Sequence, residues 1–223
     1  MPISSTGNLY PIASFIADLK PRRVIDIGVG FGLYGALCRQ ILDIADGRYE
    51  KSRWQAQIRG IESYGEYRTP LWDYVYDEVI IGDALQIVPQ CGRVDLALLC
   101  DVIEHFSRED GFRLIEKILA IADCLIISTP LVGMFEENEY TARNSNERHL
   151  SFWTEQDFRP WLRARRLESM TGVFLLSKES VDPRVGFHSG VAYSFRRALK
   201  NSMPEPAVRS VRNIRRALRS RIK

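Results

Sequence analysis

Residues 24–32, with the sequence VIDIGVGFG, could bind a small charged ligand. A β-branched run leads into a turn in which every second residue from Gly28 to Gly32 is glycine, so backbone N–H groups are open to close approach. The helix expected to follow would add the positive end of its dipole. A shifted pattern ending at Gly35 also matches the dinucleotide fingerprint. Asp26 favours a different ligand, because a carboxylate repels a pyrophosphate and attracts an ammonium group.

Three further acidic residues each follow a strand-like segment. Glu62 closes the run IRGIE, Asp83 follows EVIIG, and Asp101 follows VDLALLC. In open α/β sheets, ligands bind at the edge where the parallel strands have their carboxyl ends. We therefore expect these three side chains and Asp26 to lie along one binding edge.

The pattern D-x-G-x-G-x-G at residues 26–32 resembles motif I of the class I S-adenosylmethionine-dependent methyltransferases, and the resemblance covers about residues 20–160. In that family the first acid lies near the methionine amino group of S-adenosyl-L-methionine. The acid after the second strand holds both ribose hydroxyls, and the acid after the third meets the adenine amino group. The resemblance therefore implies that the cofactor is bound by Asp26, Gly28, Gly30, Gly32, Glu62, Asp83, Ala84 and Asp101, the last of them close to the methyl group.

Residues 101–106, DVIEHF, are the most informative segment for catalysis. In many members of the family that the chain resembles, the Glu-His pair after the fourth strand lines the pocket. A methyl acceptor such as a hydroxyl must lose its proton, and an imidazole titrates in the useful range. We therefore expect His105 to act as the base, with Glu104 beside it facing the acceptor.

A divalent metal site is the second interpretation of this segment. Asp101, Glu104 and His105 fall at i, i+3 and i+4, and the pattern resembles the E-x-x-E-H of small-RNA 2′-O-methyltransferases and of ubiquinone-pathway O-methyltransferases. Those families use a further histidine after the fifth strand, which His149 in RHLSFWT would supply. A metal would lower the pKa of the attacking oxygen. The metal-free pocket is favoured, because Asp101 is shorter than the usual glutamate and relatives without a metal share the Glu-His pair.

Strand-like segments alternate with segments of helical periodicity. The expected strands are 24–28, 58–62, 78–83, 94–100 and 123–129, and the expected helices are 8–20, 33–45 and 108–121. This alternation predicts an α/β fold, with a Rossmann-like, doubly wound, seven-stranded sheet in a single domain.

The C-terminal third carries the remaining expected elements. We expect a helix over 154–164 with Thr154 as its N-cap, and an antiparallel edge hairpin of 169–177 with 190–198. The long polar segment 131–153 is expected to cover the site.

The charge of the chain is unevenly distributed. The net charge is +3, but six arginines and Lys223 follow Glu205 without any acid, so the rest of the chain is net acidic. Within 206–223, apolar residues recur every three or four positions, which predicts a basic amphipathic helix. We assign the methyltransferase domain to 1–200 and a basic tail to 201–223. The tail is expected to be solvated or to contact an anionic membrane surface. A nucleic acid, or an acidic patch on the same fold or on a sister subunit, is a weaker alternative.

Cysteine usage and hydropathy bear on location. The four cysteines (Cys38, Cys91, Cys100 and Cys124) show no metal-binding or disulfide spacing. The N-terminus lacks the pattern of a signal peptide, and no apolar run is long enough for a membrane span. We expect a cytoplasmic protein with reduced thiols and no transmembrane segment, peripheral at the membrane if the tail binds there.

The predicted activity is S-adenosylmethionine-dependent methylation of an oxygen atom on a small-molecule or sugar-like acceptor. RNA 2′-O-methylation is one alternative, with the basic tail as the RNA-binding arm. A non-catalytic cofactor-binding or scaffold protein of the same fold is another. A nicotinamide-dependent oxidoreductase is disfavoured by Asp26 and by the long separation between the glycine turn and Glu62.

Overall fold

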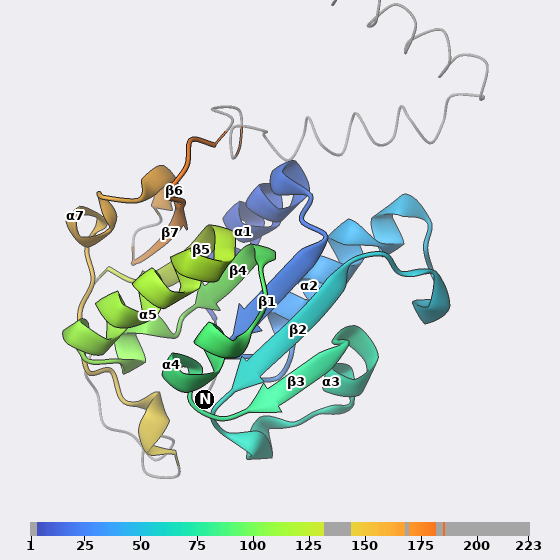
Figure 1. Ribbon diagram of the computed structural model, residues 1–223, viewed down its shortest axis with the longest axis horizontal. Coiled ribbons are helices and arrows are strands. Elements are labelled where there is room, and N and C mark those ends of the chain that lie inside the picture. Colours follow the sequence, from blue (N-terminus) through green and yellow to red (C-terminus); the bar gives the residue numbers. More distant parts are fainter. Residues whose placement is uncertain (1–3, 132–143, 168–169, 182–184, 186–223) are drawn as a thin grey trace, which may run out of the picture. The chain divides into compact units, whose positions relative to one another are not determined.

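The computed structural model describes residues 4–131, 144–167, 170–181 and 185 (Figure 1). The chain divides into two compact units, Met1–Gly186 and Phe187–Lys223, and the described residues belong to the first. The expected strand at 190–198 and the basic tail at 201–223 therefore lie outside the described residues.

A seven-stranded sheet forms the centre of the first unit, with the order β3-β2-β1-β4-β5-β7-β6. Its strands are β1 (Arg23–Ile27), β2 (Gln57–Glu62), β3 (Glu78–Ile81), β4 (Val94–Cys100), β5 (Ala122–Pro130), β6 (Leu162–Leu167) and β7 (Thr171–Leu176). Strands β1 to β5 pair in parallel, whereas β7 is antiparallel to both β5 and β6. The predicted Rossmann-like fold with an antiparallel edge hairpin is confirmed.

Helices cover both faces of this sheet (Figure 1). Helices α1 (Thr6–Leu19), α2 (Leu33–Leu42) and α3 (Pro70–Val75) pack on one face, in a core with Val24, Leu96 and Leu98. Helices α4 (Ala84–Ile87), α5 (Arg108–Ile121) and α7 (Glu155–Phe158) pack on the other face, in a core with Ile25, Ala97 and Leu99. The central strands β1 and β4 are thus buried on both faces, which explains their near-continuous apolar sequences.

Short 3₁₀ turns complete the connections. They are Ile44–Asp46, Lys51–Arg53, Gly65–Tyr67, Val88–Gln90, Ile103–His105 and Ser145–Glu147. All four cysteines are buried free thiols. Within the described residues, no helix has the length and apolar character to span a membrane.

The C-terminal part of the sheet corrects two expectations. The helix expected over 154–164 covers only Glu155–Phe158, where Thr154 and Asp157 form a capping box. It ends just before Pro160, which has no backbone N–H to continue the helical hydrogen bonds. Residues 162–167 instead form β6, whose side chains alternate between half-buried and exposed positions. The strand expected over 169–177 is β7, and its hairpin partner is 162–167. The expected partner 190–198 lies outside the described residues.

Candidate functional site

The glycine turn follows β1 at the carboxyl edge, the edge of the sheet where its parallel strands have their carboxyl ends. Gly28, Gly30 and Gly32 have φ angles of 80°, 52° and 97°, in the left-handed region that favours glycine. A Cβ on Gly28 would lie 2.3 Å from Cγ2 of Val102. The Gly28 amide also donates a 2.8 Å hydrogen bond to the carbonyl of Ile61 in β2. Contacts with the ends of two neighbouring strands therefore fix the path of the turn.

Asp26 lies in β1 just before the turn and is 1% exposed. Its Oδ2 atom accepts a 2.5 Å hydrogen bond from the hydroxyl of Tyr76. Its Oδ1 atom is buried and has no hydrogen-bond partner among the described residues. Burial raises the pKa of this carboxyl group to about 7; the Tyr76 hydrogen bond limits the rise, and Glu62 adds to it. Asp26 thus changes charge near neutral pH, and its contact with a ligand ammonium stays a prediction.

Glu62 is buried at the end of β2, on the other side of the same turn. Its Oε2 atom accepts a 2.8 Å hydrogen bond from the amide of Gly30. Its Oε1 atom accepts a 2.9 Å hydrogen bond from the amide of Tyr64. Two acidic residues that are 36 positions apart in the sequence, Asp26 and Glu62, therefore flank one glycine turn.

Asp83 and Ala84 follow β3, the strand beside β2. Asp83 is exposed and caps α4, because its Oδ1 atom accepts a 2.9 Å hydrogen bond from the amide of Leu85. Ala84 is buried against the sheet. Both residues lie at the carboxyl edge, as expected, although Asp83 also has a structural role as a helix cap.

Asp101 lies at the end of β4 and adopts a φ of 55°, which is unusual for a residue other than glycine. Its Oδ1 atom accepts hydrogen bonds from the Ser128 hydroxyl at 2.9 Å and from the Asn8 amide group at 3.4 Å. Its Oδ2 atom is buried without a hydrogen-bond partner in the described part of the chain. Burial raises the pKa of this carboxyl group as well. Backbone strain and an unsatisfied oxygen together are typical of functional sites.

Sequence reasoning missed the contribution of α1. Asn8 is fully buried, and its Oδ1 atom accepts a 2.7 Å hydrogen bond from Thr171 while its amide group reaches Asp101. These contacts join residues 93 and 163 positions apart. A polar residue near the start of an apolar helix is a weak signal, so only the tertiary structure identifies Asn8 as part of the site.

Glu104, His105 and His149 form a compact cluster at the same edge. One potential ligand atom from each lies within 4.8 Å of the others, and Asp101 is outside this group. The Thr129 hydroxyl donates a 3.2 Å hydrogen bond to Oε2 of Glu104. Burial raises the pKa of Glu104 to about 8 and holds the pKa of both histidines below their usual value. The cluster therefore consists of a largely protonated carboxyl group and two neutral imidazoles at neutral pH.

A buried tryptophan anchors the segment that carries His149. Trp153 packs against Gly111 of α5, and its indole N–H donates to the hydroxyl of Ser151 at 2.7 Å. Arg108 of α5 donates to the carbonyl of Phe152 and lies over the Trp153 ring, with its guanidinium carbon 4.9 Å from the ring centroid. These contacts anchor the segment against α5, and the ring of His149 lies beside that of His105, with 5.0 Å between the ring centroids.

Residues 144–151 connect the two ends of the site. Near β2, Glu147 accepts a 2.7 Å hydrogen bond from the hydroxyl of Tyr67. Near β4, the carbonyl of Glu104 accepts hydrogen bonds from the amides of Leu150 and Ser151. This part of the segment expected to cover the site thus contacts both sides of it, while residues 132–143 lie outside the described residues.

The fold is that of the class I S-adenosylmethionine-dependent methyltransferases. An O-methyltransferase family protein from Burkholderia thailandensis has a similar structure, with a TM-score of 0.55 and 13% identity over 80% of this chain and 57% of that chain. The N-terminal domain of EvdMO1 with SAH bound gives a TM-score of 0.53 and 14% identity, over 79% of this chain and 83% of that domain.

The magnesium protoporphyrin IX methyltransferase ChlM from Synechocystis PCC 6803, also with bound SAH, gives a TM-score of 0.54 and 16% identity over 78% of this chain and 83% of that one. The chain therefore spans a little over half of the Burkholderia protein and most of the other two. No protein-family model and no curated protein matches this sequence.

Proposed function

We propose that this protein is an S-adenosylmethionine-dependent methyltransferase that acts on an oxygen atom of a small-molecule acceptor. The observation that carries the proposal is the glycine turn flanked by the buried carboxyl groups of Asp26 and Glu62. The EvdMO1 domain and ChlM have the same fold and contain bound SAH, which supports this choice of cofactor.

The residues around the turn fit such a cofactor. Oδ1 of Asp26 is a buried acceptor with no partner in the described structure, so it can accept a hydrogen bond from an ammonium group. In this proposal Glu62 and Asp83 bind the ribose hydroxyls and the adenine amino group, and Asp101 lies near the methyl group. When bound, S-adenosylmethionine supplies a methyl group already activated by its sulfonium. The protein then has mainly to orient the acceptor and remove its proton.

His105 has the properties of the base. Its Nδ1 atom lies 3.1 Å from the carbonyl oxygen of Arg148, which can only accept a hydrogen bond. The proton of the neutral ring therefore resides on Nδ1, and Nε2 keeps the lone pair that can take a proton from the acceptor hydroxyl. Burial lowers the pKa of the ring, which keeps it in this basic form. Glu104, protonated at neutral pH, positions the chain around His105 in this proposal.

The Glu104–His105–His149 cluster also favours a second version of the reaction, in which a divalent metal helps to activate the acceptor. A metal-bound histidine usually donates its other ring N–H to a carbonyl or carboxylate, as Nδ1 of His105 does to Arg148. Glu104, His105 and His149 would hold the ion, which would lower the pKa of a coordinated hydroxyl.

Calorimetric titration with S-adenosylmethionine and S-adenosylhomocysteine tests the cofactor. We expect binding to wild-type protein and a loss of about tenfold or more in the E62Q variant, because a charged acceptor of hydroxyl groups is removed. Glu78, exposed at the opposite end of neighbouring β3, provides the matched E78Q control. Absence of binding to folded wild-type protein would refute the proposal.

Titration of the cofactor-bound protein with Mn²⁺, Co²⁺ and Zn²⁺ distinguishes the metal-free reaction from the metal-assisted one. Metal-assisted transfer requires stoichiometric binding that H149A abolishes. If no ion binds and methyl transfer persists in the presence of a chelator, the metal-free version with His105 as base stands.

A further inference from the structure

Tyr76 lies between α3 and β3 and joins two parts of the glycine turn. Its buried hydroxyl donates to Oδ2 of Asp26 at 2.5 Å and accepts a hydrogen bond from the amide of Gly35 at 3.0 Å. Asp26 precedes the turn, and Gly35 belongs to the first turn of α2. One hydroxyl thus connects the buried carboxyl group to the start of the helix.

This contact replaces the missing cap of α2. The N-cap residue of the helix is Gly32, which has no side chain to accept a hydrogen bond from the third amide of the helix. That amide belongs to Gly35, and Tyr76 accepts its hydrogen bond from 41 residues away. Position 35 must be glycine, because a Cβ there would lie 2.2 Å from Cζ of Tyr76.

Helix α3 holds the same turn at two more points. The indole N–H of Trp72 donates a 2.8 Å hydrogen bond to the carbonyl of Gly30. The hydroxyl of Thr69, the N-cap of α3, donates to the carbonyl of Phe31 at 3.1 Å. Thr69 and Trp72 at the start of α3, and Tyr76 just after its end, therefore contact the segment 30–35, in which the backbone is expected to bind the cofactor.

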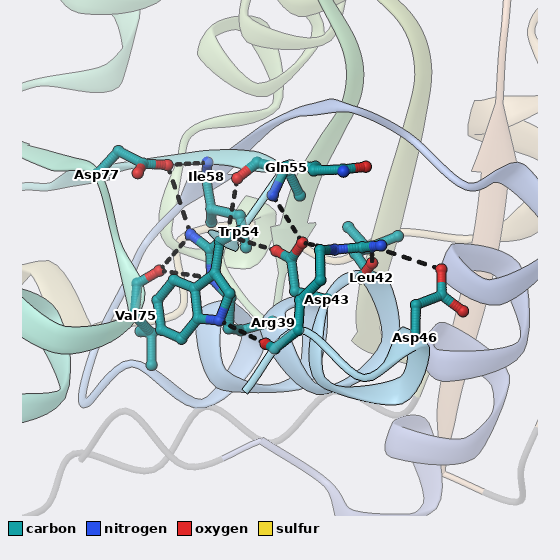
Figure 2. Close-up of polar contacts among 11 residues, drawn as sticks. Arg39, Leu42, Asp43, Asp46, Trp54, Gln55, Ile58, Val75 and Asp77 are labelled. Carbon is teal, nitrogen blue, oxygen red and sulfur yellow. Dashed lines mark hydrogen bonds and ion pairs between the residues drawn. The ribbon is translucent and has the colours of Figure 1, made fainter. Parts of the chain in front are cut away.

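A buried arginine fixes the position of Tyr76 itself. Figure 2 shows Arg39 of α2 donating to the carbonyl of Val75 and to the carboxylate of Asp77, the residues on either side of Tyr76. Arg39 also forms a 2.7 Å ion pair with the fully buried Asp43. The ion pair holds the Arg39 guanidinium in place, and its hydrogen bonds position the chain on both sides of Tyr76.

We propose that Tyr76 is a positioning residue of the cofactor site, which orients the carboxyl group of Asp26 and the first turn of α2 for binding of the amino-acid end of S-adenosylmethionine. This inference rests on the proposed function. By holding Oδ2, Tyr76 leaves Oδ1 as the oxygen of Asp26 that is available to the ligand.

The charge of Asp26 makes this role measurable. Its pKa is raised to about 7 by burial, and the Tyr76 hydrogen bond opposes the rise because it stabilises the charged form. The other titratable groups that interact with Asp26 come from three elements: Cys38 of α2, Glu62 of β2 and Cys100 of β4. Burial raises the pKa of both thiols, so they stay neutral near pH 7.

The test is calorimetric titration with S-adenosylhomocysteine from about pH 6 to about pH 8.5, with wild type, Y76F and Y74F. Wild-type binding should strengthen as the pH rises through about 7, because charged Asp26 attracts the ligand ammonium. In Y76F the midpoint of this pH dependence should move to higher pH, and the affinity for S-adenosylhomocysteine at neutral pH should fall about tenfold. Tyr74 is an exposed residue of α3, two positions before Tyr76, so Y74F should behave as wild type.

A double-mutant cycle with D26N shows whether Tyr76 acts through Asp26. D26N should lose the pH dependence, and Y76F should cost less affinity in the D26N background than in wild type, because only the contact with Gly35 then remains to be lost. A wild-type midpoint and affinity in Y76F would overturn the inference, as would fully additive losses in the double variant. If wild type itself binds no cofactor, the proposed function fails; if wild type binds and Y76F matches Y74F, only the role of Tyr76 fails.

A second variant covers the case in which Y76F does not fold. Difluorotyrosine at position 76 keeps the ring and the hydroxyl but makes the hydroxyl a stronger donor. It should therefore lower the pKa of Asp26 and move the binding midpoint to lower pH. An unchanged midpoint in this variant would also overturn the inference.

Discussion

The Nδ1 atom of His105 lies 3.1 Å from the carbonyl oxygen of Arg148, and this contact selects one tautomer of the ring. We predict that His105 is neutral at pH 7 with its proton on Nδ1. Its pKa should lie below the usual value for histidine, because the ring is partly buried. Nitrogen-15 NMR of the histidine side chains, assigned with H105Q, measures both properties. A proton on Nε2 would remove His105 as the base, and a pKa above about 6.5 would contradict the effect given to burial.

The H105Q variant should also separate binding from chemistry. Because His105 is proposed to face the acceptor, its replacement should leave the affinity for S-adenosylhomocysteine within about twofold of wild type while slowing methyl transfer by about a hundredfold or more. A large loss of cofactor affinity in H105Q would mean that the ring has a structural role in the cofactor site.

The buried carboxyl group of Glu104 should make stability depend on pH. Its pKa is about 8 in the folded protein, against about 4.3 in an unfolded chain, so between these values the folded state holds a proton that the unfolded state has lost. Its contribution to stability is therefore present at low pH and is lost as the pH rises toward about 8.

Thermal unfolding of the E104Q variant isolates this contribution. Glutamine cannot ionise, so the Tm of E104Q relative to wild type should increase from about pH 5 to about pH 8.5. Glu116, exposed on α5, gives the matched E116Q control, in which an exposed carboxyl group is replaced instead of a buried one. A constant difference for E104Q would mean that Glu104 is charged in the folded protein.

Gly111 should tolerate no larger side chain. Alanine in a helix normally stabilises, but a Cβ at position 111 would lie 2.4 Å from Cζ2 of Trp153. We predict that G111A lowers the free energy of unfolding by about 1–3 kcal/mol, the cost of overpacking a buried contact. Urea denaturation measures this change. In the G92A control, no described atom lies within 4 Å of the added Cβ, so its effect should be small.

The buried ion pair of Arg39 should contribute far more to the free energy of unfolding than an exposed ion pair does. Removing a buried partner leaves Asp43 with fewer compensating contacts, so R39M should cost about 3–5 kcal/mol of unfolding free energy. Arg68 pairs with Asp73 on the surface, and R68M should cost about 1 kcal/mol or less. Denaturant titration of both variants makes the comparison, and similar losses would contradict the role given to burial.

The regular part of the fold followed from local pattern. The strand 94–100 and the helix 108–121 coincide with β4 and α5, because a continuous apolar run and a 3.6-residue period are unambiguous there. Part of Leu162–Leu167 was expected to continue a helix, but this segment is a strand. Its arginines suit the exposed face of a helix as well as that of a strand. Helix α3 was not predicted at all, because six residues are too few to show a helical period.

For the site, the sequence by itself determined which acidic residues end the parallel strands and therefore share the carboxyl edge, because strand order and connection handedness constrain an α/β sheet strongly. It could not determine which polar atoms meet. The contacts of Tyr76 with Asp26, of Asn8 with Asp101 and of His105 with Arg148 join residues 43 to 93 positions apart. Only tertiary packing decides such contacts, and burial in that packing sets the pKa of each group and hence the chemistry it can perform.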